Sequence, residues 1–266
     1  MGVTTATKGD FERFQMEVPD LASLPKDPPK TYSPFLSRFI MWLERKNREA
    51  SIYGNPAIFD TRSFSWVQKV ERSFPDIRKE LLQVLERREE LPNFQDIATD
   101  VRTITKDDHW KTFFLSGYGL KSLRNMRRCP KTVRALRSIP GVKTVFFSIL
   151  SPGKQIPVHK GPYNGVLRYH LGLVVPKKRE NCAIWINGQF HHWEEGKSLI
   201  FDDSFYHAAW NNTDEVRAIL FLDFVRPMKF PFNLLNRAVL AIAPIVMPNF
   251  REGFQNHKKW EKKFYR

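Results

Sequence analysis

The stretch VKTVFFSIL, at residues 142–150, begins a series of short apolar segments that decides the fold. Turn residues separate it from four further segments of the same kind: VLRYHLGLVV at 166–175, CAIWING at 182–188, SLIFDD at 198–203 and AILFLDF at 218–224. Short segments rich in β-branched and aromatic residues, spaced by turns, predict an antiparallel β-sandwich or barrel.

Helical patterns precede this β region. Apolar residues recur with helical spacing in FLSRFIMWLERKNREA at 35–50 and in PDIRKELLQVLERREEL at 75–91, and a shorter helix is expected in CPKTVRALRSI at 129–139. We expect these helices to pack against the sheet. The predicted fold class is therefore mainly β with flanking helices, an α+β arrangement.

The chain divides into four expected segments. Residues 1–34 are polar and rich in proline, which predicts an extended arm. Residues 35–140 form a helical flanking region packed on the core, and residues 141–228 form the β core. Residues 229–266 form a basic, partly apolar C-terminal extension.

The C-terminal extension contains an apolar run of ten residues, Ala238–Met247, which is interrupted by Pro244 and followed by the basic sequence HKKWEKKFYR. A bilayer span needs about 20 apolar residues, so this run is too short to cross a membrane. Two interpretations remain open, a helix docked on the domain and an anchor lying in the membrane interface.

Charge and cysteine content restrict the expected partners and cellular location of the protein. The 266 residues include 43 Lys and Arg against 28 Asp and Glu, a net charge of +15 that favours phosphate-rich partners or an anionic membrane. No nucleic-acid motif is recognisable, so no specific nucleic acid is expected. Cys129 and Cys182 form no metal or disulfide pattern, and the first residues lack an apolar leader. We expect a cytoplasmic location, with peripheral contact to the inner face of a membrane as an open alternative.

Two histidines stand at the edges of predicted strands. His159 lies in QIPVHKGPYNG, just before a strand, and His207 lies in IFDDSFYHAAW, just after one. Neutral imidazole binds iron, copper and zinc, so the pair predicts a metal in the mouth of a small barrel. His191 and His192 are expected in a turn, without a role in that site.

Two arginines fall on strands that look buried. Alternation along 166–175 puts Arg168 and His170 on one face, and Arg217 begins the last apolar strand. A buried guanidinium without an anion is costly, and a small dicarboxylate held by bidentate hydrogen bonds would satisfy it. The alternative is pairing within the chain, with the acids Asp202, Asp203 or Asp223.

Longer strings in this region resemble the aspartyl/asparaginyl β-hydroxylase family. They are FSILSPG, PVHKGPYNGVLRYHLGLVVP, WEEGKSLIFDDSFYHAAWNN and VRAILFLDFVRP, and the resemblance covers residues 129–227. The family comprises oxygenases that use Fe(II), 2-oxoglutarate and O2, and it includes a bacterial lipid A acyl-chain hydroxylase branch. The resemblance implies a double-stranded β-helix, or cupin-like jelly roll, in agreement with the run of short strands.

The resemblance also implies roles for single residues. His159 and His207 match the iron-binding histidines, and Arg217 matches the residue that pairs with the distal carboxylate of 2-oxoglutarate. Further cosubstrate contacts are implied for Arg168, His170 and Ser148.

One position departs from the commonest iron site of such oxygenases, in which a carboxylate follows the first histidine by two residues. That position is Gly161 here. The gap leaves room for water held by a nearby acid, for which Asp203 is the candidate, Asp202 is the competitor, and a structural role for both acids is open.

The resemblance points to two substrate classes. CPKTVRALRSIPGVK and RPMKF look like the lipid hydroxylase branch, whereas WEEGKSLIFDDSFYH looks like the peptidyl branch. Phe146 is expected beside Ser148 on the cosubstrate face, where an aromatic ring suits an acyl chain better than a carboxylate. Lipid hydroxylation is therefore preferred and peptidyl aspartyl/asparaginyl hydroxylation is the alternative. A halogenase and a non-catalytic cupin-like binding module are more remote.

Overall fold

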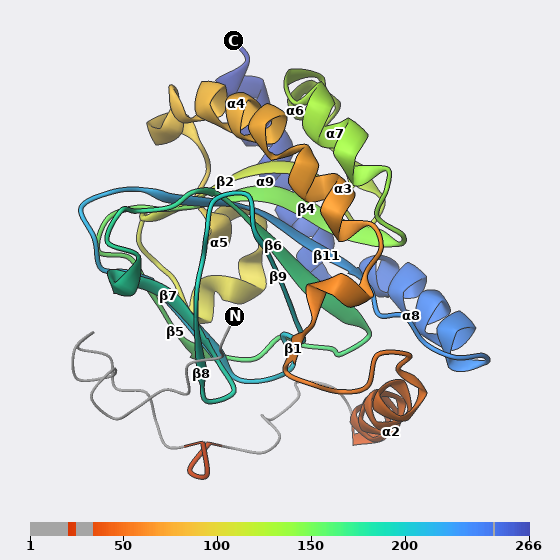
Figure 1. The fold of residues 1–266 in the computed structure, drawn as a ribbon. Coiled ribbons are helices and arrows are strands. Elements are labelled where there is room, and N and C mark those ends of the chain that lie inside the picture. The colour runs from red at the N-terminus through yellow and green to blue at the C-terminus, as the bar shows by residue number, and fades with distance from the viewer. Residues whose placement is uncertain (1–20, 25–33, 247) are drawn as a thin grey trace.

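A computed structural model describes residues 21–24, 34–246 and 248–266, and its centre is a pair of facing antiparallel sheets (Figure 1). The larger sheet has the order β1-β9-β6-β11-β4-β2-β3 and the smaller has the order β5-β10-β7-β8. The larger sheet contains β1 (Ile58–Phe59), β9 (Ser198–Phe201), β6 (Val166–Val174), β11 (Arg217–Val225), β4 (Val142–Leu150), β2 (Trp110–Gly117) and β3 (Leu120–Lys121). The smaller contains β5 (Gln155–His159), β10 (His207–Asn211), β7 (Cys182–Ile186) and β8 (Gln189–His192). This is the predicted double-stranded β-helix.

Alternation along the long strands separates two apolar layers. On β4, Val145, Phe147 and Ile149 join the core under the helices, whereas Phe146 and Leu150 join the core between the sheets. Leu167, Tyr169, Leu171 and Leu173 of β6 also face the helices. The remaining alternate positions therefore face the smaller sheet, as the period of two predicts.

Helices cover the outer face of the larger sheet (Figure 1). They are α3 (Val67–Arg72), α4 (Phe74–Leu85), α6 (Leu123–Arg128), α7 (Pro130–Leu136) and the C-terminal α9 (Pro248–Phe264), and the short α5 (Phe94–Ile97) contacts α9. Ile77, Leu81 and Val84 of α4 are buried in this layer. Two helices differ from expectation: α4 ends at Leu85, before the 3-10 turn Arg88–Glu90, and the helix expected at 129–139 is α7, preceded by α6.

The segment 35–140 is less purely helical than its sequence suggests. Its strand β2 pairs with β4 along almost its whole length, from Trp110 opposite Leu150 to Gly117 opposite Thr144. β2 is buried on both faces, so it lacks the clean polar alternation of a surface strand. The β core thus includes strands from outside residues 141–228.

The C-terminal extension forms two helices of different character. Helix α9 docks on the domain, because Phe264 is buried in the outer core and the Trp260 indole donates a hydrogen bond to the Glu90 carbonyl at 2.6 Å. Helix α8 (Phe232–Val246) lies beside α2 (Pro34–Ala50) at the edge of the domain. Among the described residues, no helix is long and apolar enough to cross a membrane.

The expected arm at residues 1–34 falls almost wholly outside the described residues. Of its described part, Leu24 packs against the small cluster formed by Trp185, Trp210 and their neighbours on β7 and β10.

Candidate metal and anion site

The two candidate metal ligands are direct neighbours across strands β5 and β10. His159 ends β5 and His207 begins β10, and the antiparallel register places the two residues opposite each other. Their ring centroids are 4.1 Å apart. Each Nδ1 lies within hydrogen-bond distance of the carbonyl two residues earlier, at 2.8 Å from Pro157 and 2.9 Å from Phe205. When Nδ1–H donates to these carbonyls, both Nε2 atoms are left as unprotonated ligands.

The environment keeps both imidazoles neutral. Burial lowers the pKa of His159 to about 4. Burial, with His159 and Arg168 nearby, lowers the pKa of His207 well below its ordinary value. A neutral imidazole is the form that binds a metal ion. In the part of the chain that the structure describes, no cluster of three or more His, Cys, Asp or Glu side chains is present, so the two histidines have no carboxylate completing a triad.

Arg217 is a buried cation that pairs with no carboxylate of the described residues. It is 2% exposed, and none of the ion pairs among the described residues involves it. Its guanidinium carbon lies 4.4 Å from the centre of the Trp193 ring, and one terminal nitrogen lies 3.4 Å from the Ser148 carbonyl and 3.5 Å from its hydroxyl. Nε has no hydrogen-bond partner, and burial lowers the pKa of Arg217 to about 10. This environment suits an anionic ligand.

Ser148 and His170 lie near this cation. The Trp110 indole donates a hydrogen bond to the Ser148 hydroxyl at 3.0 Å, and the Trp193 indole donates to Nδ1 of His170 at 3.4 Å. Nε2 of His170 is buried without a partner. Burial, together with Arg168 and Arg217, holds the pKa of His170 well below its ordinary value. His170 therefore presents a neutral, unsatisfied nitrogen.

Arg168 has the opposite environment to Arg217. Its guanidinium pairs with Asp203 at 2.8 Å and with Asp223 at 2.9 Å, over the ring of Phe221. Burial alone would lower the pKa of Arg168, but the two carboxylates raise it above its ordinary value. Pairing within the chain thus describes Arg168, whereas it does not describe Arg217.

Asp203 occupies the space beside Gly161. A Cβ atom at residue 161 would lie 2.1 Å from Oδ2 of Asp203, and the Gly161 amide donates a hydrogen bond to the Asp203 carbonyl at 2.7 Å. Oδ1 of Asp203 is buried without a partner. Burial raises the pKa of Asp203 to about 7, and it outweighs the opposing effect of Arg168. The carboxylate therefore stands where a side chain at position 161 would begin.

The other sequence candidates lie in different surroundings. Asp202 forms a buried ion pair with Arg226 and accepts a hydrogen bond from the Ser204 amide at 3.0 Å. Phe146 lies in the core between the sheets, with ring centroids 4.3 Å from Phe221 and 5.1 Å from Phe94. His191 and His192 lie on strand β8, so the expected turn is wrong there.

Three aromatic residues of the site were not singled out from the sequence. Trp193 lies against Arg217 and His170, Phe201 lies 5.5 Å from the His207 ring, and Phe221 lies 5.1 Å from the His170 ring. Trp193 directly follows the histidine pair 191–192, and its indole N–H was the available signal, since a buried indole needs an acceptor.

The chain is similar to a protein family and to several known proteins. The sequence profile of the aspartyl/asparaginyl β-hydroxylase family matches residues 71–227. The ornithine lipid ester-linked acyl 2-hydroxylase of Rhizobium tropici is 50% identical over 241 residues, which cover 91% of this chain and 85% of that protein. The human aspartyl/asparaginyl β-hydroxylase is 34% identical over 170 residues, which cover 62% of this chain and 22% of that protein. Among solved structures, a Pseudomonas putida prolyl-4-hydroxylase matches with 16% identity and a TM-score of 0.38, over 58% of this chain and 88% of that one.

The two sheets form a double-stranded β-helix, and the family profile together with the similar proteins places the chain in the class of hydroxylases. The chain belongs to the aspartyl/asparaginyl β-hydroxylase family, because the family profile covers more than half of its length. An enzyme is thereby favoured over a non-catalytic binding module.

Proposed function

We propose that this protein is an Fe(II)- and 2-oxoglutarate-dependent dioxygenase that hydroxylates a lipid acyl chain. The observation that carries the proposal is the pair formed by His159 and His207, whose rings are neutral and oriented by backbone carbonyls, near a buried arginine with no acid of its own. Nitrogen ligands of this kind fit Fe(II). The bound iron and O2 supply the oxidation of an unactivated C–H bond, which no side chain can perform.

The chain's own groups bind and orient the cosubstrate. Arg217 would pair with the distal carboxylate of 2-oxoglutarate, with the Ser148 hydroxyl adding a polar contact beside it. Trp193 covers one side of the guanidinium and excludes water there. The free Nε2 of His170 gives a further polar contact in the same interior. A charge-assisted pair of this kind is strongest where water is excluded.

Arg168 and Asp203 have a positioning role in this proposal. Arg168 holds the Asp203 carboxylate against Gly161, two residues after the first metal ligand. The unpartnered Oδ1 of Asp203 can accept a hydrogen bond from a water at the position that a triad carboxylate would fill. A metal held by two histidines and no carboxylate could also bind a halide. Halogenation is therefore the second activity to test.

The choice of a lipid substrate rests on two observations. The relative from Rhizobium tropici, whose similarity covers 91% of the chain, is named for hydroxylation of a lipid acyl chain. The core between the sheets carries the aromatic rings of Phe146, Phe201 and Phe221, which offer no charge partner to a substrate carboxylate. The human relative is named for aspartyl and asparaginyl residues, so a peptide is the alternative substrate.

The setting proposed for the enzyme is the cytoplasm, in peripheral contact with the inner face of an anionic membrane. The net charge of +15 supports this setting, and no specific nucleic acid is expected as a partner.

The test is anaerobic loading with Fe(II) and 2-oxoglutarate, followed by exposure to O2 with ornithine-type lipids or with Asp- and Asn-containing peptides. The expected result is succinate formation coupled to a mass gain of one oxygen on the lipid. Oxygen added only to the peptide would assign the peptidyl activity, and chloride-dependent product would assign halogenation. His159→Ala and His207→Ala should each abolish coupled succinate formation and reduce binding of Fe(II), whereas His192→Ala should retain both.

A further inference from the structure

Helix α8 exposes several large apolar side chains to solvent. Leu234, Ile242 and Ile245 recur at helical spacing and are 57%, 53% and 82% exposed. The buried side of the same helix carries Asn236 and Leu240, which are 0% and 3% exposed. A surface helix of a water-soluble domain carries its apolar residues mainly on the core side, whereas α8 carries large apolar side chains on its exposed side as well.

Helix α2 extends the same surface. Phe35 is 83% exposed, and Phe39 and Trp42 follow it at positions i+4 and i+7 with substantial exposure. Phe39 stacks on Trp42, and Trp42 meets Phe232 of α8 edge-on with ring centroids 6.2 Å apart. Exposed Phe230 adjoins the start of α8. We call this surface the α2–α8 face; it comprises Phe35, Phe39, Trp42, Phe230, Leu234, Ile242 and Ile245.

The charge around the α2–α8 face is basic. Helix α2 and residues 229–246 contain six basic residues, Arg38, Arg45, Lys46, Arg48, Lys229 and Arg237, against only two acidic ones, Glu44 and Glu49. Arg38, Lys229 and Arg237 are exposed, and no ion pair among the described residues engages them. Exposed apolar side chains bordered by free cations match the surface of an anionic bilayer.

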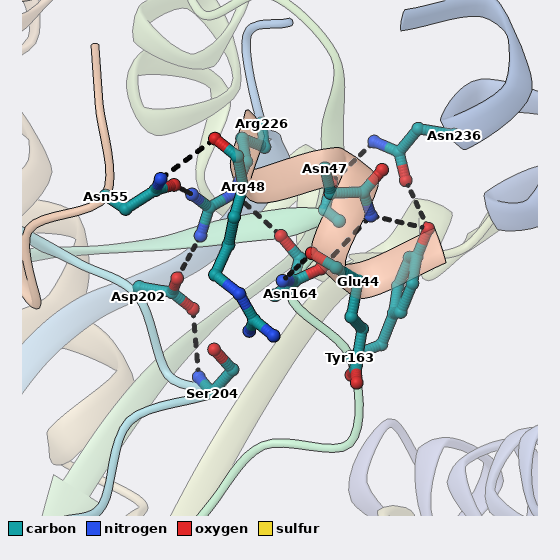
Figure 2. A network of polar contacts seen from close by, with 11 residues as sticks. Glu44, Asn47, Arg48, Asn55, Tyr163, Asn164, Asp202, Ser204, Arg226 and Asn236 are labelled. Carbon is teal, nitrogen blue, oxygen red and sulfur yellow. Dashed lines mark hydrogen bonds and ion pairs between the residues drawn. The ribbon is translucent and has the colours of Figure 1, made fainter. Parts of the chain in front are cut away.

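A buried polar network joins this face to the loop that follows His159. The amide of Asn47 on α2 donates hydrogen bonds to the Tyr163 hydroxyl at 2.9 Å and to Asn164 at 3.0 Å (Figure 2). The Tyr163 hydroxyl in turn donates to Asn236 of α8 at 2.8 Å. Both helices are thereby fixed to residues that stand four and five positions after a candidate metal ligand.

The network continues to the loop before His207. Nε of Arg226 donates to the Asn164 carbonyl at 2.7 Å, and the same guanidinium pairs with Asp202 (Figure 2). Asp202 adjoins Asp203 and stands five positions before His207. The two loops of the metal site and the two helices of the exposed face are therefore one connected unit.

We propose that the α2–α8 face binds an anionic lipid surface and holds the metal-site loops at that surface. This inference rests on the proposed function and deepens it, since it names the surface that receives the lipid. A lipid surface is favoured over a second copy of the chain. In a symmetric dimer the exposed cations around the face would lie near the same cations of the partner and repel them, whereas lipid phosphates would attract them.

The test is cosedimentation of the full chain with vesicles of phosphatidylcholine, with and without phosphatidylglycerol, at low and high salt. The triple variant Leu234→Ser/Ile242→Ser/Ile245→Ser should lose at least tenfold in vesicle affinity. The variant Arg38→Gln/Lys229→Gln/Arg237→Gln should lose about fivefold in vesicle affinity for each cation removed, and its binding should depend less steeply on salt. The matched control is Leu82→Ser/Leu123→Ser, which removes exposed apolar groups from α4 and α6 and should bind as wild type.

Each measurement has an outcome that overturns the proposal. Absence of binding to anionic vesicles at low salt, or an equal loss in the control variant, would refute it. Light scattering that shows a dimer dissociated by the α8 triple variant would assign the face to a second copy instead. Circular dichroism verifies folding, and 2-oxoglutarate turnover with lipid dispersed in detergent is read separately. Turnover without vesicle binding refutes the docking face alone, and vesicle binding without turnover refutes the proposed function alone.

Discussion

Each end of the paired strands β6 and β11 carries an arginine, and the two arginines differ in their ion pairs. At one end, Arg168 stands opposite Asp223 in the strand register and also pairs with Asp203. At the other end, Arg217 is more deeply buried, and among the described residues it has no ion pair but lies beside Ser148 and the face of Trp193. The cation at the first end is paired with acids of the chain, whereas no described residue forms an ion pair with the cation at the second end. A buried cation left without an anion indicates a position prepared for a ligand.

The comparison also separates stability from binding. Removing one member of a buried ion network leaves its partners charged and unpaired, which is strongly destabilising. Removing a buried cation that has no ionic partner leaves no such charge behind. Substitution of Arg168 should therefore lower the free energy of unfolding, whereas substitution of Arg217 should lower the affinity for the cosubstrate.

The largest expected effect is on folding, in Arg168→Met. The change leaves Asp203 and Asp223 buried without their cation, and the free energy of unfolding should fall by about 3–5 kcal/mol. Arg217→Met is the matched change at the other end and should leave stability unchanged or higher. Urea unfolding of the two variants measures both free energies. Equal destabilisation would contradict the claim that only the arginine at the first end has a structural ion pair.

The second effect is on cosubstrate binding, in Arg217→Ala. Loss of the guanidinium should weaken 2-oxoglutarate by about 2–5 kcal/mol, because the distal carboxylate loses its charged partner. Arg217→Lys should recover only part of the affinity, since an ammonium group lacks the planar fork. Titration of the Fe(II)-loaded protein measures the affinity. An unchanged affinity in the alanine variant would show that Arg217 does not bind the distal carboxylate of 2-oxoglutarate.

The third effect tests the space that Asp203 fills. Gly161→Asp should lower stability by about 1–3 kcal/mol through overpacking, because its Cβ would meet the Asp203 carboxylate at 2.1 Å. Gly161→Asp/Asp203→Gly removes that clash and should regain stability. Thermal unfolding compares the two variants. A stable single variant with tighter Fe(II) binding would show instead that the site accepts a third protein ligand.

The fourth effect is a pH dependence at the paired end. The pKa of Asp203 is raised to about 7, so between pH 4 and pH 7 the native state binds more protons than the unfolded state. Its contribution to stability must then fall as the pH rises, by at most about 1.4 kcal/mol per pH unit. Asp203→Asn removes this slope. The difference between the two unfolding profiles isolates Asp203, since both proteins share the same histidines, and parallel profiles would contradict the raised pKa.

The sequence predicted the long central strands of the β core. Short apolar runs and turn residues located β4, β6, β7, β9 and β11, and the period of two assigned the faces of β4 and β6. The strands β5, β8 and β10 of the smaller sheet were not predicted. Strand β2 was missed because a strand buried on both faces carries no alternation to detect. Helix α8 was recognised as apolar, but its composition did not reveal that Leu234, Ile242 and Ile245 are exposed.

The sequence by itself determined which groups carry the chemistry: His159 and His207 at strand edges, and two arginines on buried strands. Backbone periodicity is local, so it can be read without knowing the rest of the chain. Only the tertiary structure decided that Arg168 receives both acids, that Arg217 receives none, and that Asp203 fills the space beside Gly161. Those pairings join residues 35 to 55 positions apart, and the free energy of a buried charge depends on neighbours that only folding brings together.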